Sequence, residues 1–270
     1  MPHAPRANLT GWTCAPFTGG GYTHDVYRRG PDIPGPGVVL IPEMPGLTPE
    51  VLALGNYLVD NGFTVAAPSL YGTPGAAAQR PGVIPILARG CVAREFAAFA
   101  TNKKRPVSYF LRALARDLNE STPGKGVGVI GQCWSGGFAL AAAVDDAVLA
   151  PVLSQPSLPL GLTAARRRDP GVSEDELKVV QRRAAEEGLC ALGLRFSEDR
   201  MSPAERFDTL RERLGDAFEV IEIDSRPGNP GGFGRAAHSA LTLEVRDVEG
   251  QPAREARERV VKFLWERLAG

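Results

Sequence analysis

The sequence predicts an α/β fold with a mainly parallel central sheet flanked by helices on both faces. Short β-branched and apolar runs alternate with helical patterns through most of the chain, as in folds built around a parallel sheet. At 270 residues the chain is long enough for one such domain with a full core. We therefore expect residues 36–270 to form a single domain, preceded by an N-terminal arm and edge hairpin at residues 1–35.

The predicted strands and helices follow one another along the whole chain. The strands are short apolar runs bounded by glycine, proline or polar residues, at 37–41, 63–67, 127–130, 148–153, 191–196 and 218–223. The helices carry apolar residues at helical spacing, at 49–59, 108–118, 136–143 and 253–268. Thr48 is the expected N-cap of the first helix, because Pro49 and Glu50 follow it at positions favoured in a first turn.

Two further segments have a distinctive composition. Residues 72–90 contain several glycines and prolines and predict a loop, followed by a short helix at about 94–100. A charged insertion near 163–187 includes a predicted helix at 173–187. This helix has few apolar residues to bury, so we expect it to form a solvated outer face.

Composition excludes several classes of partner. The 31 basic and 31 acidic residues cancel and the pI is near 6.8, so neither nucleic acid nor an anionic membrane is favoured as a partner. No apolar run approaches the roughly 18 residues of a membrane-spanning helix, and the first residues lack the apolar segment of a secretory signal. We predict a cytoplasmic protein with reduced thiols, while the sequence indicates no particular oligomeric state.

The cysteines do not form a metal-binding pattern. They are widely spaced, with no Cys-x-x-Cys pair and no neighbouring histidine, at Cys14, Cys91, Cys133 and Cys190. We therefore expect neither a metal nor another cofactor.

The stretch VGVIGQCWSGGFALAAA, residues 127–143, has the composition of a sharp turn between a buried strand and a helix. Cys133 lies at the tip, two residues after Gly131, in the arrangement of a nucleophile elbow. Small residues are required two positions on either side, here Gly131 and Ser135, and the two glycines that follow let the helix approach the sheet closely. The N–H groups at the start of the helix favour a thiolate and an oxyanion beside it.

Two other interpretations of this turn stay open. Cys133 can be a small buried residue of a glycine-rich turn, although the Gly-x-Gly-x-x-Gly pattern of a dinucleotide-binding turn is absent. Ser135 is the nucleophile if residues 133–137 are taken as small-x-Ser-x-Gly. That choice moves the tip two residues into the start of the helix, so Cys133 fits the position of Gly131 better.

A nucleophilic thiol needs a base, and His238 is the best placed of the three histidines. It follows the last predicted strand and a glycine-rich loop, and it precedes the C-terminal helix. The acid is expected after strand 191–196, where Asp199 is favoured over its neighbour Glu198 because a turn ending in Pro203 follows. The order Cys133, acid, histidine is the nucleophile–acid–base order of α/β-hydrolases. We therefore predict an α/β-hydrolase fold with Asp199 orienting the imidazole and stabilising its charged form.

With these residues in place, the chain resembles the dienelactone hydrolase family of α/β-hydrolases from about residue 37 to its C-terminus. Residues 131–136, GQCWSG, are similar to the family's G-x-C-x-G-G elbow, and Asp199 and His238 match its acid and base segments. Residues 42–46, PEMPG, are similar to the family's segment after the first core strand.

The resemblance implies roles for residues that the sequence alone leaves unassigned. Glu43 takes the place of a glutamate that interacts with the resting thiol and helps to generate the thiolate when substrate arrives. The backbone N–H groups of Met44 and Trp134 then form the oxyanion hole. Arg94 matches the first of two arginines that hold a substrate carboxylate in the family, whereas no arginine follows His238 until Arg246.

The pattern also departs from the family. Ser135 stands where the family usually has glycine, and the insertion near 163–187 is longer than the family core requires.

Taken together, these motifs predict a hydrolase of a small ester or lactone that uses Cys133, His238 and Asp199 through a thioester intermediate. A cyclase or lyase of a biosynthetic pathway and a non-catalytic binding protein are the alternatives on the same scaffold.

Overall fold

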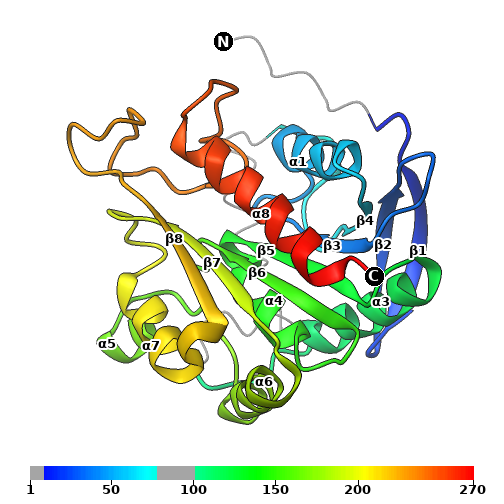
Figure 1. Cartoon of the computed structure of the whole chain (residues 1–270), viewed down its shortest axis with the longest axis horizontal. Coiled ribbons are helices and arrows are strands. Elements are labelled where there is room, and N and C mark those ends of the chain that lie inside the picture. The colour runs from blue at the N-terminus through cyan, green and yellow to red at the C-terminus, as the bar shows by residue number, and fades with distance from the viewer. Residues whose placement is uncertain (1–8, 78–100) are drawn as a thin grey trace.

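The computed structural model describes residues 9–77 and 101–270. In this part of the chain a single sheet has the strand order β1-β2-β4-β3-β5-β6-β7-β8 (Figure 1). The strands are β1 (Thr13–Gly19), β2 (Tyr22–Arg29), β3 (Gly37–Ile41), β4 (Thr64–Pro68), β5 (Val127–Gln132), β6 (Val148–Ser154), β7 (Ala191–Phe196) and β8 (Phe218–Ile223). Strands β4, β3, β5, β6, β7 and β8 are parallel to one another. Strand β2 pairs antiparallel with β4, and β1 pairs antiparallel with β2 and forms the edge of the sheet.

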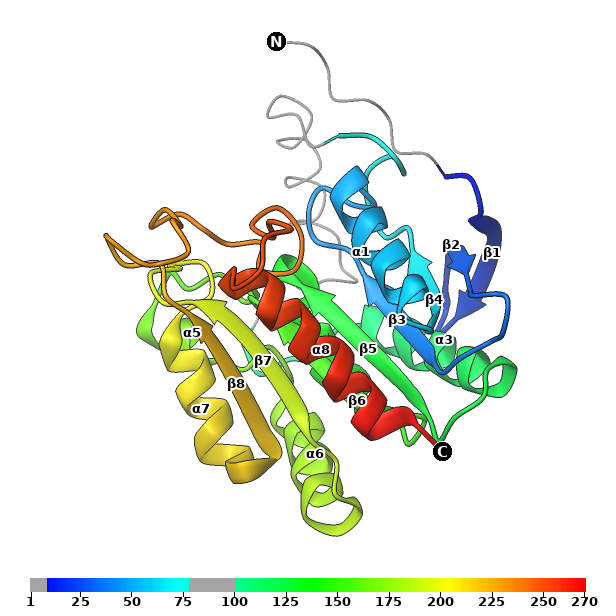
Figure 2. The ribbon, with the colours of Figure 1, turned by 45° about the horizontal axis from the view of Figure 1, so that its top comes forward.

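Helices cover both faces of this sheet. On one face lie α1 (Pro49–Asp60) and α8 (Pro252–Leu268), and on the other lie α3 (Val107–Ser121), α4 (Gly136–Ala142), α6 (Glu174–Glu187) and α7 (Ala204–Leu214) (Figure 2). Strand β3 serves both cores, because Val39 and Ile41 pack on one face and Val38 and Leu40 on the other. The predicted mainly parallel sheet flanked by helices is confirmed. Among the described residues, no helix is long and apolar enough to cross a membrane.

Local signals fix several of these elements. The Thr48 hydroxyl accepts a hydrogen bond from the Val51 N–H at 3.4 Å, so α1 begins where the sequence predicts a cap. Helix α6 begins with a capping box, in which Ser173 and Glu176 each accept a backbone N–H of the other. It ends at Gly188, whose φ of +70° is left-handed and suits glycine.

Helix α6 is more deeply anchored than its composition predicts, and the expectation of a solvated outer face is wrong for one side of it. Leu177 and Val180 are buried against the core, and Arg183 is 1% exposed. The Arg183 guanidinium donates to the carbonyl oxygens of Ala143 at 2.8 Å and Val148 at 3.0 Å. The charged side chain is buried here because it satisfies carbonyl groups at the end of α4 and at the start of β6.

The carboxyl ends of the parallel strands lie at one edge of the sheet, where long connections gather (Figure 2). These connections include the segment from β6 to α6, which contains the short helix α5 (Ala164–Arg168), and the segment from β8 to α8. In open α/β sheets this edge is where ligands bind. The predicted helix at 94–100 and Arg94 lie outside the described residues.

Candidate active site

Cys133 lies at the carboxyl end of the central strand β5, on the tip of the turn that leads into α4. Its φ is +50°, a left-handed conformation that a non-glycine residue rarely adopts, and its side chain is 7% exposed. The turn is a 3₁₀ segment, Cys133–Ser135, joined directly to the helix. A Cβ on Gly131 would lie 2.3 Å from the carbonyl oxygen of Ser135, so the tight return of the chain excludes any larger residue there.

Ser135 lies inside the turn and is fully buried. Its hydroxyl accepts the N–H of Gln132 at 3.0 Å and lies within donating distance of the carbonyl oxygens of Gln132 at 2.9 Å and Pro42 at 3.0 Å. These bonds occupy the hydroxyl on both sides. Ser135 thus ties the elbow to the end of β3.

The two glycines after the elbow serve a different contact from the one predicted. A Cβ on Gly136 would lie 2.5 Å from the Cα of Pro156, and one on Gly137 would lie 3.4 Å from the Cα of Gly171. Both neighbours belong to the connection between β6 and α6. The glycines therefore admit this connection against the elbow, whereas the close approach of helix and sheet depends on Gly131.

His238 and Asp199 meet at the carboxyl edge, from the connections that follow β8 and β7. The imidazole Nδ1 lies 2.7 Å from Asp199 Oδ2, and Asp199 Oδ1 accepts the N–H of Met201 at 2.9 Å. Asp199 is 5% exposed. Its neighbour Glu198 instead lies 3.9 Å from the guanidinium of Arg235, with 36% of its side chain exposed.

The protonated form of His238 is strongly favoured in this setting. Burial by itself lowers the pKa of the imidazole, but the hydrogen bond to Asp199 and the interaction with the Cys133 sulfur outweigh burial and raise the pKa to about 11. An imidazolium thus lies between the Asp199 carboxylate and the Cys133 sulfur. This arrangement is chemically suited to an ion pair with a thiolate.

A buried hydroxyl that the sequence analysis missed lies near both the sulfur and the imidazole. Ser157 Oγ is 3.7 Å from Cys133 Sγ and 3.5 Å from His238 Nε2. Ser157 lies three residues beyond β6, in a connection whose path cannot be deduced from local patterns. No sequence signal marks this serine, because serine is common in loops of every kind.

Glu43 lies in the site, but the thiol is not its hydrogen-bond partner. Its carboxylate accepts hydrogen bonds from Ser239 Oγ at 2.8 Å, from Thr242 Oγ1, and from Gln155 Nε2 at 3.4 Å. No hydrogen bond joins it to Cys133 within residues 9–77 and 101–270. Burial raises the pKa of Glu43, and the bonds from Thr242 and Ser239 oppose that rise.

The groups predicted to form an oxyanion hole lie on adjacent strand ends. Ile41 at the end of β3 pairs with Gly131 of β5, so the segment containing Met44 begins beside the elbow. Trp134 is the second residue of the 3₁₀ turn, and N–H groups at such a start have no partner within the helix. Tyr71, also missed from sequence, donates its hydroxyl to the carbonyl oxygen of Pro42 on the same segment.

Tyr71 is also electrostatically linked to the site. Burial, and secondarily the Cys133 sulfur, raise the pKa of Tyr71 well above its usual value. Its phenol therefore stays neutral and remains a donor.

Arg246, the first arginine after His238 in sequence, packs elsewhere: its guanidinium lies 6.0 Å from the Phe233 ring centre and 3.5 Å from the Gly231 carbonyl oxygen. Arg94 falls outside the described residues.

A family model for the dienelactone hydrolase family matches residues 25–268 of this sequence. The chain belongs to the dienelactone hydrolase family. Among curated proteins, no sequence matches the chain significantly. As a member of this family the protein is a hydrolase with an α/β-hydrolase fold, as the sequence predicts.

Solved structures agree with this fold. A provisionally assigned dienelactone hydrolase from Klebsiella pneumoniae subsp. pneumoniae aligns with a TM-score of 0.63 and 18% identity over 94% of this chain and 98% of that one. A dienelactone hydrolase from Anabaena variabilis aligns with a TM-score of 0.61 and 14% identity over 95% and 98%. A dienelactone hydrolase-like promiscuous phosphotriesterase from metagenomic libraries has a TM-score of 0.59 and 18% identity over 96% and 98%. At these identities the likeness shows the fold alone.

Proposed function

We propose that this dienelactone hydrolase family member cleaves a small ester or lactone through a thioester on Cys133, with His238 as acid and base and Asp199 as its partner. One observation carries the proposal: a cysteine in a left-handed turn interacts with a largely buried histidine that a carboxylate holds at 2.7 Å. Strained backbone and a strongly shifted histidine pKa are both concentrated at functional sites.

In the first half-reaction the Cys133 thiolate attacks the substrate carbonyl carbon. The negative charge that forms on the carbonyl oxygen is stabilised by the N–H groups of Met44 and Trp134. The carbon–oxygen bond to the leaving group then breaks, and His238 donates its Nε2 proton to the departing alkoxide. The products are an alcohol, or the opened end of a lactone, and a thioester on Cys133.

In the second half-reaction His238, now neutral, takes a proton from a water molecule. The resulting hydroxide attacks the thioester carbon, and collapse of the tetrahedral intermediate breaks the carbon–sulfur bond. The thiolate and the imidazolium are thereby restored together. Because a thiolate leaves more readily than an amide nitrogen, oxygen esters and lactones suit this site better than peptides.

The contacts of Ser135 favour Cys133 as the nucleophile. The Ser135 hydroxyl is fully buried and already bonded to backbone groups of Gln132 and Pro42. Using it as a nucleophile requires breaking these bonds and opening the turn. The Cys133 sulfur, in contrast, lies beside the hydroxyl that also contacts His238.

Glu43 supports the base in this proposal, and its hydrogen bonds come from Gln155, Ser239 and Thr242 instead of from the resting thiol. It accepts hydrogen bonds from Ser239, which directly follows His238, and from Thr242. The carboxylate therefore fixes the segment that positions the imidazole, and its negative charge favours the imidazolium. This role differs from the thiol contact that family resemblance implies.

The decisive experiment compares Cys133→Ala with the wild type on p-nitrophenyl acetate and a panel of lactones. We expect turnover to fall by at least about 10³-fold, because the nucleophile is lost. Cys14→Ala, which removes an exposed thiol on β1, is the matched control and should retain full activity. Intact-mass analysis of the wild type during turnover should show an acyl adduct that Cys133→Ala lacks. Wild-type turnover in Cys133→Ala overturns the proposal.

A further inference from the structure

Ser157 is a fully buried residue whose hydroxyl faces both the nucleophile and the base. Its Oγ lies 3.7 Å from Cys133 Sγ, 3.5 Å from His238 Nε2 and 3.1 Å from the carbonyl oxygen of Gln155. A hydroxyl has one proton to donate and two lone pairs with which to accept. The Ser157 O–H can therefore donate either to the sulfur or to the Gln155 carbonyl oxygen. A negative charge on the sulfur favours donation to the sulfur.

The charged resting state satisfies all of these groups at once. When His238 is an imidazolium, its Nε2–H faces both the Cys133 sulfur and Ser157 Oγ, and the Ser157 O–H can donate to the Cys133 thiolate. Hydrogen bonds with an ionised partner are roughly twice as strong as neutral ones. In the neutral state, with a thiol and an imidazole, the Gln155 carbonyl oxygen at 3.1 Å is the better acceptor for the Ser157 hydroxyl, because a thiol sulfur accepts only weakly.

The backbone around Ser157 is held against the elbow. The Ser157 N–H donates to the Cys133 carbonyl oxygen at 2.8 Å, and the Gln155 N–H donates to the Leu194 carbonyl oxygen at 2.7 Å. Gln155 has a φ of +36°, a left-handed conformation like that of Cys133. The chain thus turns sharply at the end of β6 and brings the Ser157 hydroxyl to the sulfur.

A buried arginine fixes the rest of this connection. Arg206 of α7 is fully buried, and its guanidinium donates to the carbonyl oxygens of Pro159 at 2.7 Å, Asp169 at 2.7 Å and Pro156. Burial lowers the pKa of Arg206 to about 10, so the group stays charged at neutral pH. The residues on both sides of Ser157 are therefore anchored, and its hydroxyl has little freedom to move away from the sulfur.

We propose that Ser157 is a positioning residue for the nucleophile, whose hydroxyl links Cys133 Sγ to His238 Nε2 and stabilises the thiolate–imidazolium pair of the resting enzyme. This inference rests on the proposed function of Cys133 and His238. The hydroxyl loses its charged acceptor once the sulfur is acylated, because a thioester sulfur carries no negative charge. Ser157 therefore acts on formation of the thioester more than on its hydrolysis.

The test measures iodoacetamide alkylation of Cys133 as a function of pH, with the adduct located by peptide mass analysis. In Ser157→Ala we expect the pH of half-maximal alkylation rate to rise by about one unit, the size of one charge-assisted hydrogen bond. The kcat/KM for p-nitrophenyl acetate at pH 7 should fall about tenfold and recover at higher pH, because the thiolate population is then restored. The rate of deacylation, taken from single-turnover decay of the acyl adduct, should change less than twofold.

Ser202→Ala is the matched control. Ser202 is also fully buried and lies in the connection after Asp199, but its hydroxyl has no partner among the described residues. This variant should keep the wild-type alkylation profile. Ser157→Thr retains the hydroxyl and should keep the wild-type midpoint, which separates the loss of the donor from a general loosening of the loop.

The outcomes distinguish this inference from the proposed function. If Cys133→Ala is inactive and Ser157→Ala keeps the wild-type alkylation midpoint, Ser157 has no such role and the proposed nucleophile stands. If Cys133→Ala keeps its activity, the proposed function itself fails. A midpoint that rises equally in Ser157→Ala and Ser157→Thr also overturns the role of the hydroxyl.

Discussion

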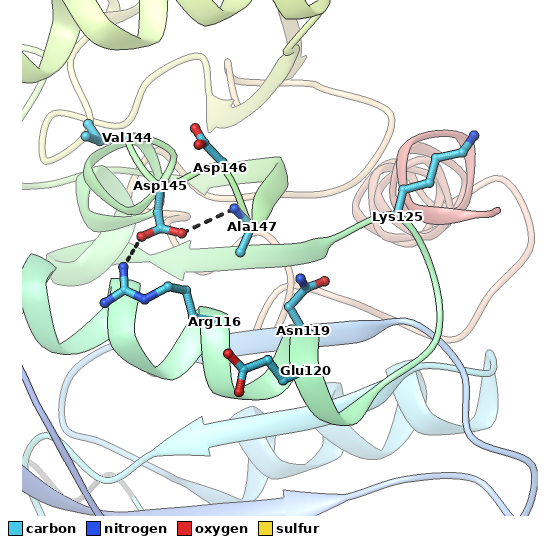
Figure 3. Close-up of a pocket in the computed structure, with 8 residues that line it drawn as sticks. All are labelled: Arg116, Asn119, Glu120, Lys125, Val144, Asp145, Asp146 and Ala147. Atoms are coloured by element: carbon cyan, nitrogen blue, oxygen red, sulfur yellow. Dashed lines mark hydrogen bonds and ion pairs between the residues drawn. The ribbon is translucent and has the colours of Figure 1, made fainter.

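The two ends of the central strands β5 and β6 differ in how deeply the nearby charged side chains are buried. At the carboxyl end, Glu43 and Asp199 are each 5% exposed, and the backbone is left-handed at Cys133 and Gln155. At the amino end an open pocket of about 610 Å³ lies between the end of α3 and the turns that precede β5 and β6 (Figure 3). Its lining is polar: Arg116, Asn119, Glu120, Lys125, Val144, Asp145, Asp146 and Ala147.

The contrast shows where the folded protein contains features that lower its stability, which suggests that they are kept for function. Withdrawing a carboxylate from water is unfavourable unless hydrogen bonds compensate it, and left-handed non-glycine residues add strain. Both features are present around Cys133. At the amino end the Arg116–Asp145 ion pair joins an arginine side chain that is 55% exposed to a carboxylate that is 12% exposed, so solvent partly screens the pair and its contribution to stability is small. Buried carboxylates and left-handed non-glycine backbone are therefore found together at the carboxyl end, whereas the residues that line this open pocket have no such combination.

The largest expected effect is at the acid of the proposed triad. Asp199→Asn removes the charge that favours the imidazolium and allows the wrong tautomer of His238, so kcat/KM should fall by about 10³- to 10⁴-fold. It should also weaken alkylation of Cys133 at neutral pH, because the pKa of His238 loses its largest raising contribution. Steady-state assays with p-nitrophenyl acetate measure the first effect.

The comparison variant for this prediction is Asp145→Asn, at the opposite end of the strands. Asp145 accepts from the Ala147 N–H at 3.2 Å and pairs with Arg116, so its carboxylate is also engaged. We expect its kcat/KM to equal that of the wild type. Equal losses of activity in the two variants would mean that the contrast between the two ends has no functional meaning.

A second expected effect concerns stability at the carboxyl end. Arg206→Met leaves several buried carbonyl oxygens without a donor, and each such loss costs about 1 to 3 kcal/mol. We expect the free energy of unfolding to fall by about 3 kcal/mol in urea titrations. Arg211→Met on the same helix is the control, because that side chain is 48% exposed and pairs with Asp208 at 3.2 Å. Its effect should stay below about 0.5 kcal/mol.

The sequence predicts the framework of this site for a physical reason. The elbow is a local structure, so Gly131, Cys133 and Ser135 reveal it through their spacing alone. Asp199 and His238 are found because parallel strands place their carboxyl ends at one edge, which makes chain order informative. Residues that follow consecutive strands are therefore predictable without knowledge of any contact.

The contacts that sequence analysis missed depend on long connections. Ser157 contacts the sulfur from a loop whose Pro156 carbonyl oxygen is bound by Arg206, about fifty residues away in sequence. Likewise, nothing near Glu43 in sequence indicates that Ser239 and Thr242 will bind its carboxylate. The charged composition of α6 was misleading for a related reason, since Arg183 is buried by carbonyl groups that only the folded chain brings together.

The third expected effect is a dependence of stability on pH at Glu43. Its pKa is raised from an ordinary value of 4.5 in the folded state, chiefly by burial. The folded protein therefore binds a proton more tightly than the unfolded chain, and the stability this provides is lost as pH rises from about 4.5 through the raised pKa. Glu43→Gln lacks this loss. As pH rises from 5 to 8, the melting temperature of the variant should therefore increase relative to that of the wild type.

Activity should move in the opposite direction in the same variant. Glutamine cannot supply the negative charge that favours the imidazolium of His238, and we expect kcat/KM at neutral pH to fall about tenfold. Thermal unfolding followed by circular dichroism across this pH range, together with ester assays, measures both effects. A melting difference that stays constant with pH would show that Glu43 is ionised at no cost in the folded protein.

The smallest expected effect lies at the polar pocket of the amino end. Arg116→Met removes one partner of the ion pair drawn in Figure 3, but Asp145, whose side chain is 12% exposed, keeps its bond from the Ala147 N–H. An ion pair with one solvent-exposed partner, here the Arg116 side chain at 55% exposure, contributes about 1 kcal/mol or less, so the free energy of unfolding should change by less than about 1 kcal/mol. Ester turnover should be unchanged, because the pocket lies at the far end of β5 from Cys133. A fall of more than threefold in kcat/KM, with stability intact, would require a path of coupling along β5 and would assign this pocket a role in the reaction.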